Sequence, residues 1–520
     1  MLTLEPFRLH LRACSLNECL LILVVFTLLF FRWFPTRRLK LPPGPRPDPF
    51  IGNLRHMSLK KQELRFTEWG RIFGDVVYFK IFGRPMIVLN TLQTAQDLME
   101  KRSLNYSCRP RFVLLVEMMG WDASLPQLPY GPRFRKQRRL ILEHFTKGVS
   151  SFRPTQRRET YILLRGLLES PGAFLQHVRR FAAGTIMKIT YGHTVCSTDE
   201  LYVRLAEEAG TDTVTSGSPG SMLVDFFPAL KHIPTWLPGA GFKRHALRTR
   251  IKVRNMHDAP YDMAAGTATP SFTSRLISDN IAAGGKCPIH DEEDIKGVAG
   301  TLYGAAADTT SATLATFFLA MILHPEVFAK AQAEIDRVVG PDRLPDFQDR
   351  SSLPYVESIV KEVYRWHCPV PLAVPHRSMN DDQYRGYDIP ADTVIIPNVW
   401  AMTRDEKMYP EADSFNPERF MNQDESGREQ TDPKDFIFGF GRRECPGKTF
   451  ADANVWLVSA CIIAAFQAPV SRNESGEKVV PQAKFTSGFV RHPEPFECDI
   501  KPRSPRYSGL IRQATNSTLH

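Results

Sequence analysis

The sequence predicts a mainly α fold with small β-sheets (α+β), built as one large domain behind an N-terminal membrane anchor. Three observations lead to this prediction. The chain of 520 residues contains no repeat period, no Ser/Gly-rich linker and no charge block that would divide it. Its hydrophobic content of 43% is ample for a packed core. A long apolar stretch, from Asp291 to the His324-Pro325 break, predicts a buried helix that crosses the whole domain.

The charge and cysteine patterns exclude several classes of protein. The formal net charge of +10 is scattered, without the basic stripe that nucleic-acid binding needs, so we expect no nucleic-acid partner. The 9 cysteines are odd in number, widely spaced and form no C-x-x-C pair. This argues against a disulfide framework, a zinc cage and an iron–sulfur cluster, and it fits a reducing compartment.

The N-terminal residues predict a membrane anchor. The run from Cys19 to Phe34 is apolar up to Arg32, and further basic residues follow it. The run is shorter than the roughly 20 residues of a full span, and a cleaved signal peptide is the alternative. No small-x-small cleavage site follows the run, and the basic cluster would retain that side in the cytosol. We expect four segments: a single-pass anchor over residues 1–40, a stiff proline-rich hinge over 41–53, the main domain over 54–505 and a C-terminal tail over 506–520.

Strand patterns occur at three places in the main domain. The segment from Asp75 to Asn90 has two β-branched and aromatic runs around a Gly-Arg-Pro turn, which predicts a hairpin. The segments TVIIPNVW (393–400) and KFTSGFV (484–490) predict further strands. Most of the remaining chain is expected to be helical.

A glycine-rich segment, FGFGRRECPG (438–447), sets one cysteine among turn formers just before a predicted helix. A lone cysteine is usually a buried structural residue, and that is the alternative here. A thiolate that ligates a haem iron needs close approach to a flat ring, which Gly441 and Gly447 allow, and a cation for the propionates, which Arg443 supplies. Pro446 directly follows Cys445, and a proline is tolerated in the first turn of a helix. We therefore expect Cys445 at a helix N-terminus, where the dipole lowers the pKa of a thiol.

The spacing F-x-x-G-x-R-x-C-x-G in this segment resembles the haem-thiolate loop of the cytochrome P450 family, and the chain as a whole resembles its fungal microsomal members. A chance match to this pattern is on the order of one in ten thousand at this composition. The resemblance implies a P450 fold with haem b (iron-protoporphyrin IX). It implies that Cys445 is the axial ligand of the haem iron. It also implies that four neighbouring residues bind the cofactor: Phe438, Gly441, Arg443 and Gly447.

Two further motifs follow the order of that family. KEVYR holds Glu362 and Arg365 at helical spacing, which by itself is usually a surface ion pair. FNPERF supplies Arg419. The resemblance implies that these three residues interlock beneath the cysteine loop. Because buried charges are costly unless they are paired, we expect a structural triad with no catalytic role.

The long predicted helix carries the segment YGAAADTTSA (303–312). The resemblance assigns Asp308 and Thr309 as the catalytic acid and alcohol that deliver protons during oxygen activation. A threonine bonded back to its own helix is the alternative. Where the family often has a glycine, this chain has Ala306, whose methyl group narrows the oxygen groove and puts the usual helix distortion in question.

The segment YGPRFRKQRRL (130–140) resembles the W-x-x-x-R helix of the family, which implies that Arg138 contacts a haem propionate. Phe134 replaces the usual tryptophan, so the indole N–H is lost while ring packing is kept. The segment PLAVPHR (371–377) implies His376 as another propionate partner, after strand residues that lie over the haem, Leu372, Ala373 and Val374. The other basic residues of the helix form either a solvated face or a docking site for an acidic electron donor: Arg135, Lys136 and Arg139.

The segments with which the family lines its substrate pocket are apolar and aromatic here, which predicts a lipophilic guest and no carboxylate clamp. The loop from His232 to Phe242 is expected to be a second membrane contact, through Ile233, Trp236 and Leu237. The candidate pocket residues are Met118, Met119, Trp121, Phe226, Phe227, Tyr303, Ala307, Val374, and the turn from Phe485 to Phe489, with Phe489 itself.

The resemblance implies a haem-thiolate monooxygenase that hydroxylates or epoxidises a small lipophilic molecule with O2, in secondary-metabolite biosynthesis of terpenoid or polyketide type. Electrons would come from NADPH through the flavins of NADPH-cytochrome P450 reductase, with cytochrome b5 as a second donor. The anchor would lie in the endoplasmic reticulum membrane lipid, with the catalytic domain in the cytosol. One rival hypothesis is a P450-fold isomerase or dehydratase that needs no reductase and no acid–alcohol pair. The other is a non-catalytic haem-binding sensor or carrier.

Overall fold

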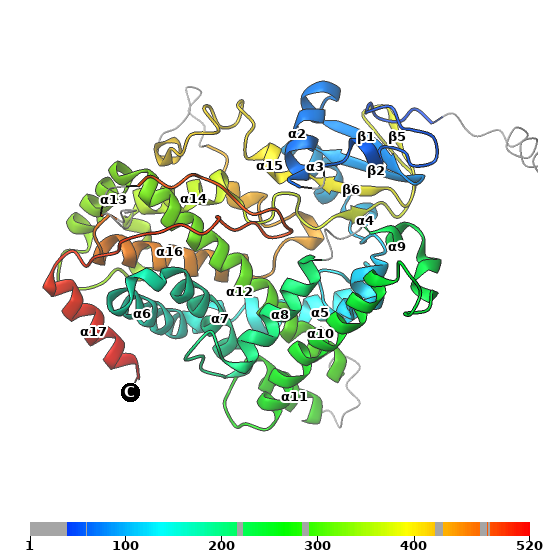
Figure 1. Cartoon of the computed structure of the whole chain (residues 1–520). Coiled ribbons are helices and arrows are strands. Elements are labelled where there is room, and N and C mark those ends of the chain that lie inside the picture. The colour runs from blue at the N-terminus through cyan, green and yellow to red at the C-terminus, as the bar shows by residue number, and fades with distance from the viewer. Residues whose placement is uncertain are drawn as a thin grey trace, which may run out of the picture.

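The computed structural model describes residues 39–58, 60–215, 222–282, 291–421, 430–468, 476 and 479–519. The described chain is mainly helical with two small sheets, as the sequence predicts (Figure 1). The expected anchor over residues 1–40 lies outside this part of the chain, apart from its last two residues.

The helices and strands have the following bounds. The helices are α2 (Gln62–Phe73), α3 (Leu92–Ala95), α4 (Ser103–Tyr106), α5 (Pro132–Ile141), α6 (Arg153–Glu169), α7 (Phe174–Tyr191), α8 (Leu201–Thr215), α9 (Leu223–Phe226), α10 (Gly241–Ala265), α11 (Phe272–Ala282), α12 (Glu292–Leu323), α13 (Pro325–Val338), α14 (Pro354–Trp366), α15 (Val399–Met402), α16 (Lys448–Ala465) and α17 (Pro505–Leu519). The strands are β1 (Val76–Ile81), β2 (Arg84–Leu89), β3 (His376–Arg377), β4 (Asp382–Tyr384), β5 (Tyr387–Ile389) and β6 (Val394–Pro397).

The long helix α12 runs through the middle of the molecule, which confirms the buried helix predicted from Asp291 onward (Figure 1). The Asp291 side chain accepts a hydrogen bond from the Asp294 amide and caps the first turn. The helix ends at His324 because Pro325 follows it. A Cβ on Gly300 would lie 2.1 Å from the His257 ring, so the close crossing of α10 over α12 depends on this glycine.

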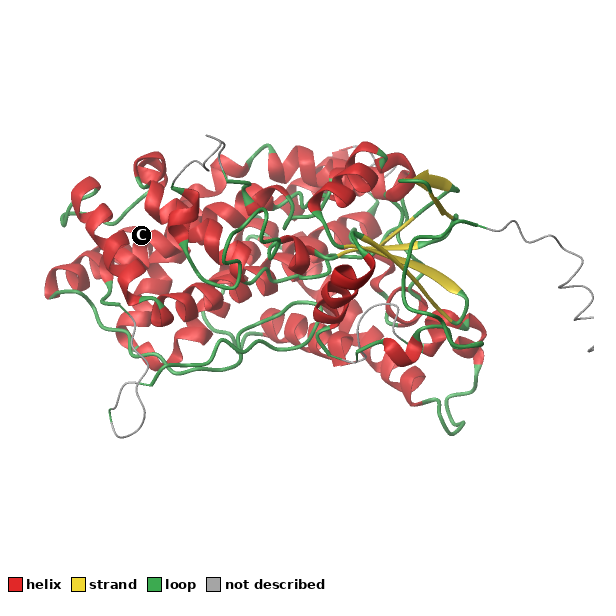
Figure 2. Ribbon diagram, turned by 90° about the horizontal axis from the view of Figure 1, so that it is seen from above, coloured by secondary structure: helices red, strands yellow, loops and turns green. Residues whose placement is uncertain are grey.

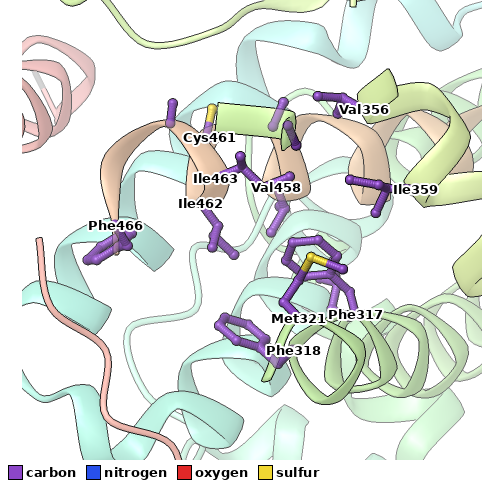
Figure 3. Packing of buried hydrophobic residues seen from close by; sticks show 14 of the residues in the cluster. Phe317, Phe318, Met321, Val356, Ile359, Val458, Cys461, Ile462, Ile463 and Phe466 are labelled. Carbon is purple, nitrogen blue, oxygen red and sulfur yellow. The ribbon is translucent and has the colours of Figure 1, made fainter. Parts of the chain in front are cut away.

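The main hydrophobic core lies where α16 packs between α12 and α14. Figure 3 shows Phe317, Phe318 and Met321 of α12 facing Val458 and Ile462 of α16. Both α12 and α16 are long and apolar enough to span a membrane by length and composition, but each is mostly buried inside the protein. Their apolar character therefore serves the core.

The sheets lie together at one end of the molecule (Figures 1 and 2). The strands β1 and β2 form the predicted antiparallel hairpin, in which Val76 faces Leu89. In the larger sheet the order is β1-β2-β6-β3, with β6 parallel to β2 and antiparallel to β3. The pair β4 and β5 forms a separate two-stranded sheet.

Two strand predictions are wrong. Leu372, Ala373 and Val374 lie in a turn, and β3 starts only at His376. Ala373 has a φ of +47°, and the prolines on either side of this turn cannot donate to a ladder. In the segment 484–490 the only pairing is one isolated bridge, between Phe485 and Pro493.

The segment after residue 505, which the sequence analysis separates as a tail, forms helix α17 on α6 and α16 (Figure 1). Tyr507 and Ile511 are buried in the main core. The described part of this segment therefore belongs structurally to the main body.

Candidate active site

The cysteine loop between Phe438 and Gly447 is a tight, glycine-dependent turn. The amide of Cys445 donates to the carbonyl oxygen of Phe438 at 2.8 Å and closes the loop. Gly441 has a φ of +51°, and a Cβ there would lie 2.5 Å from the carbonyl oxygen of Met99. Both the backbone conformation and the close approach therefore require glycine at position 441.

The Cys445 thiol faces a space within the protein. Its side chain is accessible, yet burial by the surrounding protein raises the pKa of the thiol, against weaker lowering by the Gly447 amide and the charge of Arg138. The expectation of a lowered thiol pKa is therefore wrong for the polypeptide alone, because burial outweighs the lowering by the Gly447 amide at the N-cap of α16. A side chain that is accessible and also desolvated lines an enclosed space.

The middle of α12 is also open. The turns before Gly304 and after Thr309 are buried, whereas Ala305 and Asp308 between them are exposed. An exposed turn in the centre of a buried helix means that protein side chains do not pack over it. This open turn carries the predicted acid and alcohol.

The two predicted catalytic residues have different partners in this turn. The Thr309 hydroxyl donates to the carbonyl oxygen of Ala305 at 2.8 Å, which is the back-bonded arrangement considered as the alternative. The Asp308 carboxylate lies 2.8 Å from Nε2 of His492, a residue that the sequence analysis does not single out. The helix stays regular past Ala306.

Arg443 is a buried cation whose hydrogen bonds go to backbone carbonyls. It donates to the carbonyl oxygens of Ser107 and Leu128 at 2.8 and 2.7 Å, and its guanidinium lies 3.7 Å from the ring centroid of Phe134. Burial lowers the pKa of Arg443 to about 9. The phenylalanine that replaces the family tryptophan thus packs directly on this cation.

Two further arginines and a histidine lie around Arg443. Arg109, which the sequence analysis missed, donates to carbonyl oxygens at 2.7 to 3.0 Å, and burial, followed by the charge of Arg443, holds its pKa well below the usual range. His376 donates from Nδ1 to the Tyr106 carbonyl oxygen at 2.6 Å, and burial, followed by the charge of Arg109, lowers its pKa strongly. Arg138 donates to the Glu444 carbonyl oxygen at 2.8 Å, and burial lowers its pKa.

These four basic side chains have no carboxylate hydrogen-bonded to them among the described residues. Buried cations are costly unless an anion compensates them, so the cluster suits a ligand with carboxylates. Together with the Cys445 thiol and the open turn of α12, the cluster fits a haem with two propionates. A local motif search could not find Arg109, because its partners are far away in sequence.

Glu362, Arg365 and Arg419 are brought together. Arg365 and Glu362 are fully buried and form two hydrogen bonds at 2.7 and 2.8 Å, and Arg419 lies 3.3 Å from the same carboxylate. The remaining Arg365 donors bind the carbonyl oxygens of Thr403, Ala412 and Ser414. This set thus balances its charge largely within itself and ties α14 to the segment before the cysteine loop.

The basic helix α5 is partly neutralised. Lys136 forms ion pairs with Asp291 and Asp294 at the start of α12, beside a surface cleft of about 1000 Å³. Arg135 and Arg139 are exposed. The free positive charge of this face therefore comes from Arg135 and Arg139 rather than from Lys136.

The expected pocket residues do not form one group. Tyr303 is 1% exposed, and its ring packs edge-on against Tyr191, so it belongs to the core. Met118 and Met119 are also buried, with Phe485. The ring of Phe226 packs edge-on against that of Phe82, with 5.4 Å between the ring centroids. The positions that are half-buried or exposed, and so remain candidates for substrate contact, are Trp121, Phe226, Phe227, Ala307, Val374 and Phe489.

The predicted second membrane contact is only partly exposed. Trp236 is 77% exposed, whereas Ile233 and Leu237 are half-buried. The apolar surface of this loop thus centres on the indole ring.

Comparisons with known proteins agree with this geometry. Residues 42–500 match a family model described as Cytochrome P450. The chain is 43% identical over 511 residues to Cytochrome P450 monooxygenase 176 of Postia placenta, covering 96% of this chain and 98% of that protein. It is 40% identical over 512 residues to Cytochrome P450 monooxygenase ARMGADRAFT_974139 of Armillaria gallica, covering 96% of this chain and 100% of that protein. It is 39% identical over 496 residues to Cytochrome P450 monooxygenase claR of Ampulloclitocybe clavipes, covering 94% and 91%.

Proposed function

The chain belongs to the cytochrome P450 family, and on this premise we propose that it is a monooxygenase that inserts one atom of O2 into a small lipophilic substrate. The observation that carries the proposal is the Cys445 thiol, which is accessible although protein surrounds it. A bound haem supplies one-electron and O2 chemistry.

The cofactor would be held from two sides. Cys445 would ligate the iron through its sulfur, in a loop fixed by Phe438, Gly441 and Gly447. Arg443, Arg138, Arg109 and His376 would bind the propionates, because their positive charge or N–H donors have no carboxylate of the described chain to bind. When haem binds, these side chains would replace hydrogen bonds to backbone carbonyls with charge-assisted hydrogen bonds to the propionates.

Asp308 and Thr309 would handle protons on the other face. The Thr309 hydroxyl hydrogen is committed to Ala305, so its oxygen can accept a hydrogen bond from water. The Asp308 carboxylate is exposed and can take up and release a proton at Oδ1. This pair favours a monooxygenase over an isomerase or dehydratase, which does not activate O2 and needs no acid–alcohol pair for that step.

We further propose an acidic electron donor that docks on the exposed charges of Arg135, Arg139 and Arg442. An NADPH-dependent reductase with flavins is the expected donor, with cytochrome b5 as a second one. The apolar candidate pocket residues favour a lipophilic substrate. We place the enzyme on the endoplasmic reticulum membrane by its N-terminal anchor, with Trp236 as a second contact. Secondary-metabolite biosynthesis of terpenoid or polyketide type is the proposed context.

The first experiment compares full-length protein with Cys445→Ser. Each is reduced with dithionite under carbon monoxide, and the difference spectrum is recorded. The proposal expects a strongly red-shifted Soret band in the wild type that is absent in the variant. A folded protein that binds no haem, or a spectrum that the substitution leaves unchanged, would contradict it.

A second experiment separates the enzyme from its rivals. NADPH oxidation is measured with and without purified reductase, and a panel of lipophilic compounds is screened for product. A monooxygenase requires the reductase. Product formed without reductase would support the isomerase or dehydratase hypothesis, and haem binding without any reductase-dependent NADPH oxidation would support the sensor or carrier.

A further inference from the structure

The contact between His492 and Asp308 joins two distant parts of the chain. Nε2 of His492 lies 2.8 Å from Oδ1 of Asp308, and the two side chains are 28% and 52% exposed. His492 belongs to the loop that follows Phe485, and Asp308 belongs to the open turn of α12. The pair therefore joins the acid of the active site to a partly exposed imidazole on a separate loop.

The loop holds His492 firmly in this position. Its amide donates to the Thr486 hydroxyl at 3.1 Å, and its carbonyl oxygen accepts from the Thr486 amide at 2.9 Å. The preceding Arg491 forms a buried ion pair with Glu63 at 2.8 Å. At the start of the loop, the Phe485 ring stacks on His367 with 3.5 Å between ring centroids. His492 is thus placed by anchors on both sides of the loop.

The chemistry of the turn requires a proton source. The Thr309 hydroxyl hydrogen is bonded to Ala305, and once Asp308 has released a proton its carboxylate only accepts hydrogen bonds, so Asp308 has to be reprotonated before each further transfer. Imidazole is the side chain that exchanges protons most readily near neutral pH. The neighbouring cation, Arg491, is paired with Glu63.

We propose that His492 is the positioning residue that holds Asp308 by a hydrogen bond from Nε2 and resupplies its carboxylate with protons from solvent. This inference rests on the proposed monooxygenase function. The donor is the imidazolium, which carries a proton on both ring nitrogens. In each transfer the N–H bond at Nε2 breaks and an O–H bond forms at Oδ1 of Asp308, which leaves a neutral imidazole and a neutral carboxylic acid. The imidazole then takes up a hydronium proton from solvent and becomes an imidazolium again.

The first test needs no catalysis. Full-length holoenzyme is treated with diethyl pyrocarbonate, which reacts with an unprotonated imidazole nitrogen, and labelling of each histidine is followed by mass spectrometry. Asp308→Asn should speed labelling of His492 by roughly threefold or more, because the charge-assisted hydrogen bond to Nε2 is lost. His193 is an internal control, since its Nε2 lies 2.9 Å from Glu200 and its side chain is also 28% exposed. Its labelling should not change.

The second test measures NADPH oxidation with purified reductase and no added substrate, in H2O and in D2O. His492→Gln keeps an N–H donor toward Asp308 but cannot carry a proton, and we expect it to slow oxidation about tenfold and to raise the solvent isotope effect. His492→Phe should be at least as slow. The matched control, His193→Gln, should behave as the wild type.

Two results would overturn the inference. One is a His492→Gln variant that oxidises NADPH at the wild-type rate with an unchanged isotope effect, since a structural hydrogen bond would suffice. The other is His492 labelling that ignores Asp308→Asn. The carbon monoxide spectrum of each variant separates this failure from failure of the proposed function, because a red-shifted Soret band that survives leaves the haem-thiolate enzyme intact.

Discussion

Two buried arginine clusters lie in the body of this protein and differ in one respect. Arg365 bonds to Glu362 twice, and Arg419 shares the same carboxylate, so this cluster contains its own anion. Arg443 and Arg109 are also buried but, among the described residues, donate only to backbone carbonyls, and burial lowers the pKa of each. The first cluster is complete within the polypeptide, whereas the second is arranged for an anion that the described residues do not supply.

This difference predicts opposite responses to substitution. Removing the carboxylate from the complete cluster leaves two buried arginines close together, with no negative charge to compensate them. Removing a cation from the incomplete cluster relieves desolvation in the apoprotein and weakens the binding of its anionic ligand. Stability and haem retention therefore report on different clusters.

The largest expected effect is that of Glu362→Gln. It should lower the free energy of unfolding by about 3–5 kcal/mol, because Arg365 and Arg419 lose the buried carboxylate that they share. Urea unfolding followed by circular dichroism, together with soluble yield, measures the loss. The matched control is Glu117→Gln, which also removes a carboxylate shared by two cations, but at the surface, and should cost about 1 kcal/mol or less. Equal losses in the two variants would remove the distinction between the clusters.

The next largest effect is on haem retention in Arg109→Met. Haem transfer to apomyoglobin should be about tenfold faster, since a charge-assisted hydrogen bond is lost. Unfolding of the apoprotein should change by only about 1 kcal/mol, because relief of the buried charge offsets the carbonyls left without a donor. Arg109→Lys, which keeps the charge, should retain haem better than Arg109→Met. A large loss of apoprotein stability with unchanged haem transfer would contradict this prediction. It would show that Arg109 stabilises the polypeptide, as the cluster around Glu362 does, and does not bind haem.

A smaller effect concerns the pH dependence of the apoprotein. The pKa of Arg443 is about 9 in the folded protein, below that of the unfolded chain, so above pH 9 the folded state releases a proton that the unfolded state keeps. Stability therefore rises with pH in this window, by up to about 1.4 kcal/mol per unit. The free energy of unfolding at pH 8 and pH 10 should increase more in wild type than in Arg443→Met. In the holoprotein a propionate should keep the guanidinium charged, so the extra rise should disappear.

The smallest expected effect is the coupling between Phe134 and Arg443, which are 3.7 Å apart. A double-mutant cycle with Phe134→Leu and Arg443→Met should give a coupling energy of about 0.5–1 kcal/mol in the apoprotein. A coupling of zero would mean that the ring only fills space beside the guanidinium.

The sequence allowed a correct prediction of features that depend on neighbours in the chain. The hairpin, the length of α12 and the family each follow from local patterns such as a glycine turn, a proline break or the spacing around Cys445. The strand predicted at Leu372 was wrong, because prolines and the left-handed Ala373 prevent a ladder there. Tyr303 was expected in the pocket but faces Tyr191, since the face of a helix that is apolar all round cannot be chosen from sequence.

The residues that were missed depend on contacts across the chain. Arg109 and Arg443 are far apart in sequence, as are His492 and Asp308, and no periodic pattern links either pair. Lys136 was expected on a basic face, but Asp291 and Asp294 at the start of α12 form ion pairs with it. In each case the tertiary fold chooses the partner, and local propensity carries no information about it.

The burial of Tyr507 and Ile511 by α17 has a consequence for how the chain is made. These residues fill the core beside α6 and α16, yet α17 follows both of those helices in the chain. This part of the core can therefore close only after α17 has been synthesised. A nascent chain has to keep its apolar α6 and α16 surfaces soluble until then, which makes the arrival of α17 a late step in folding.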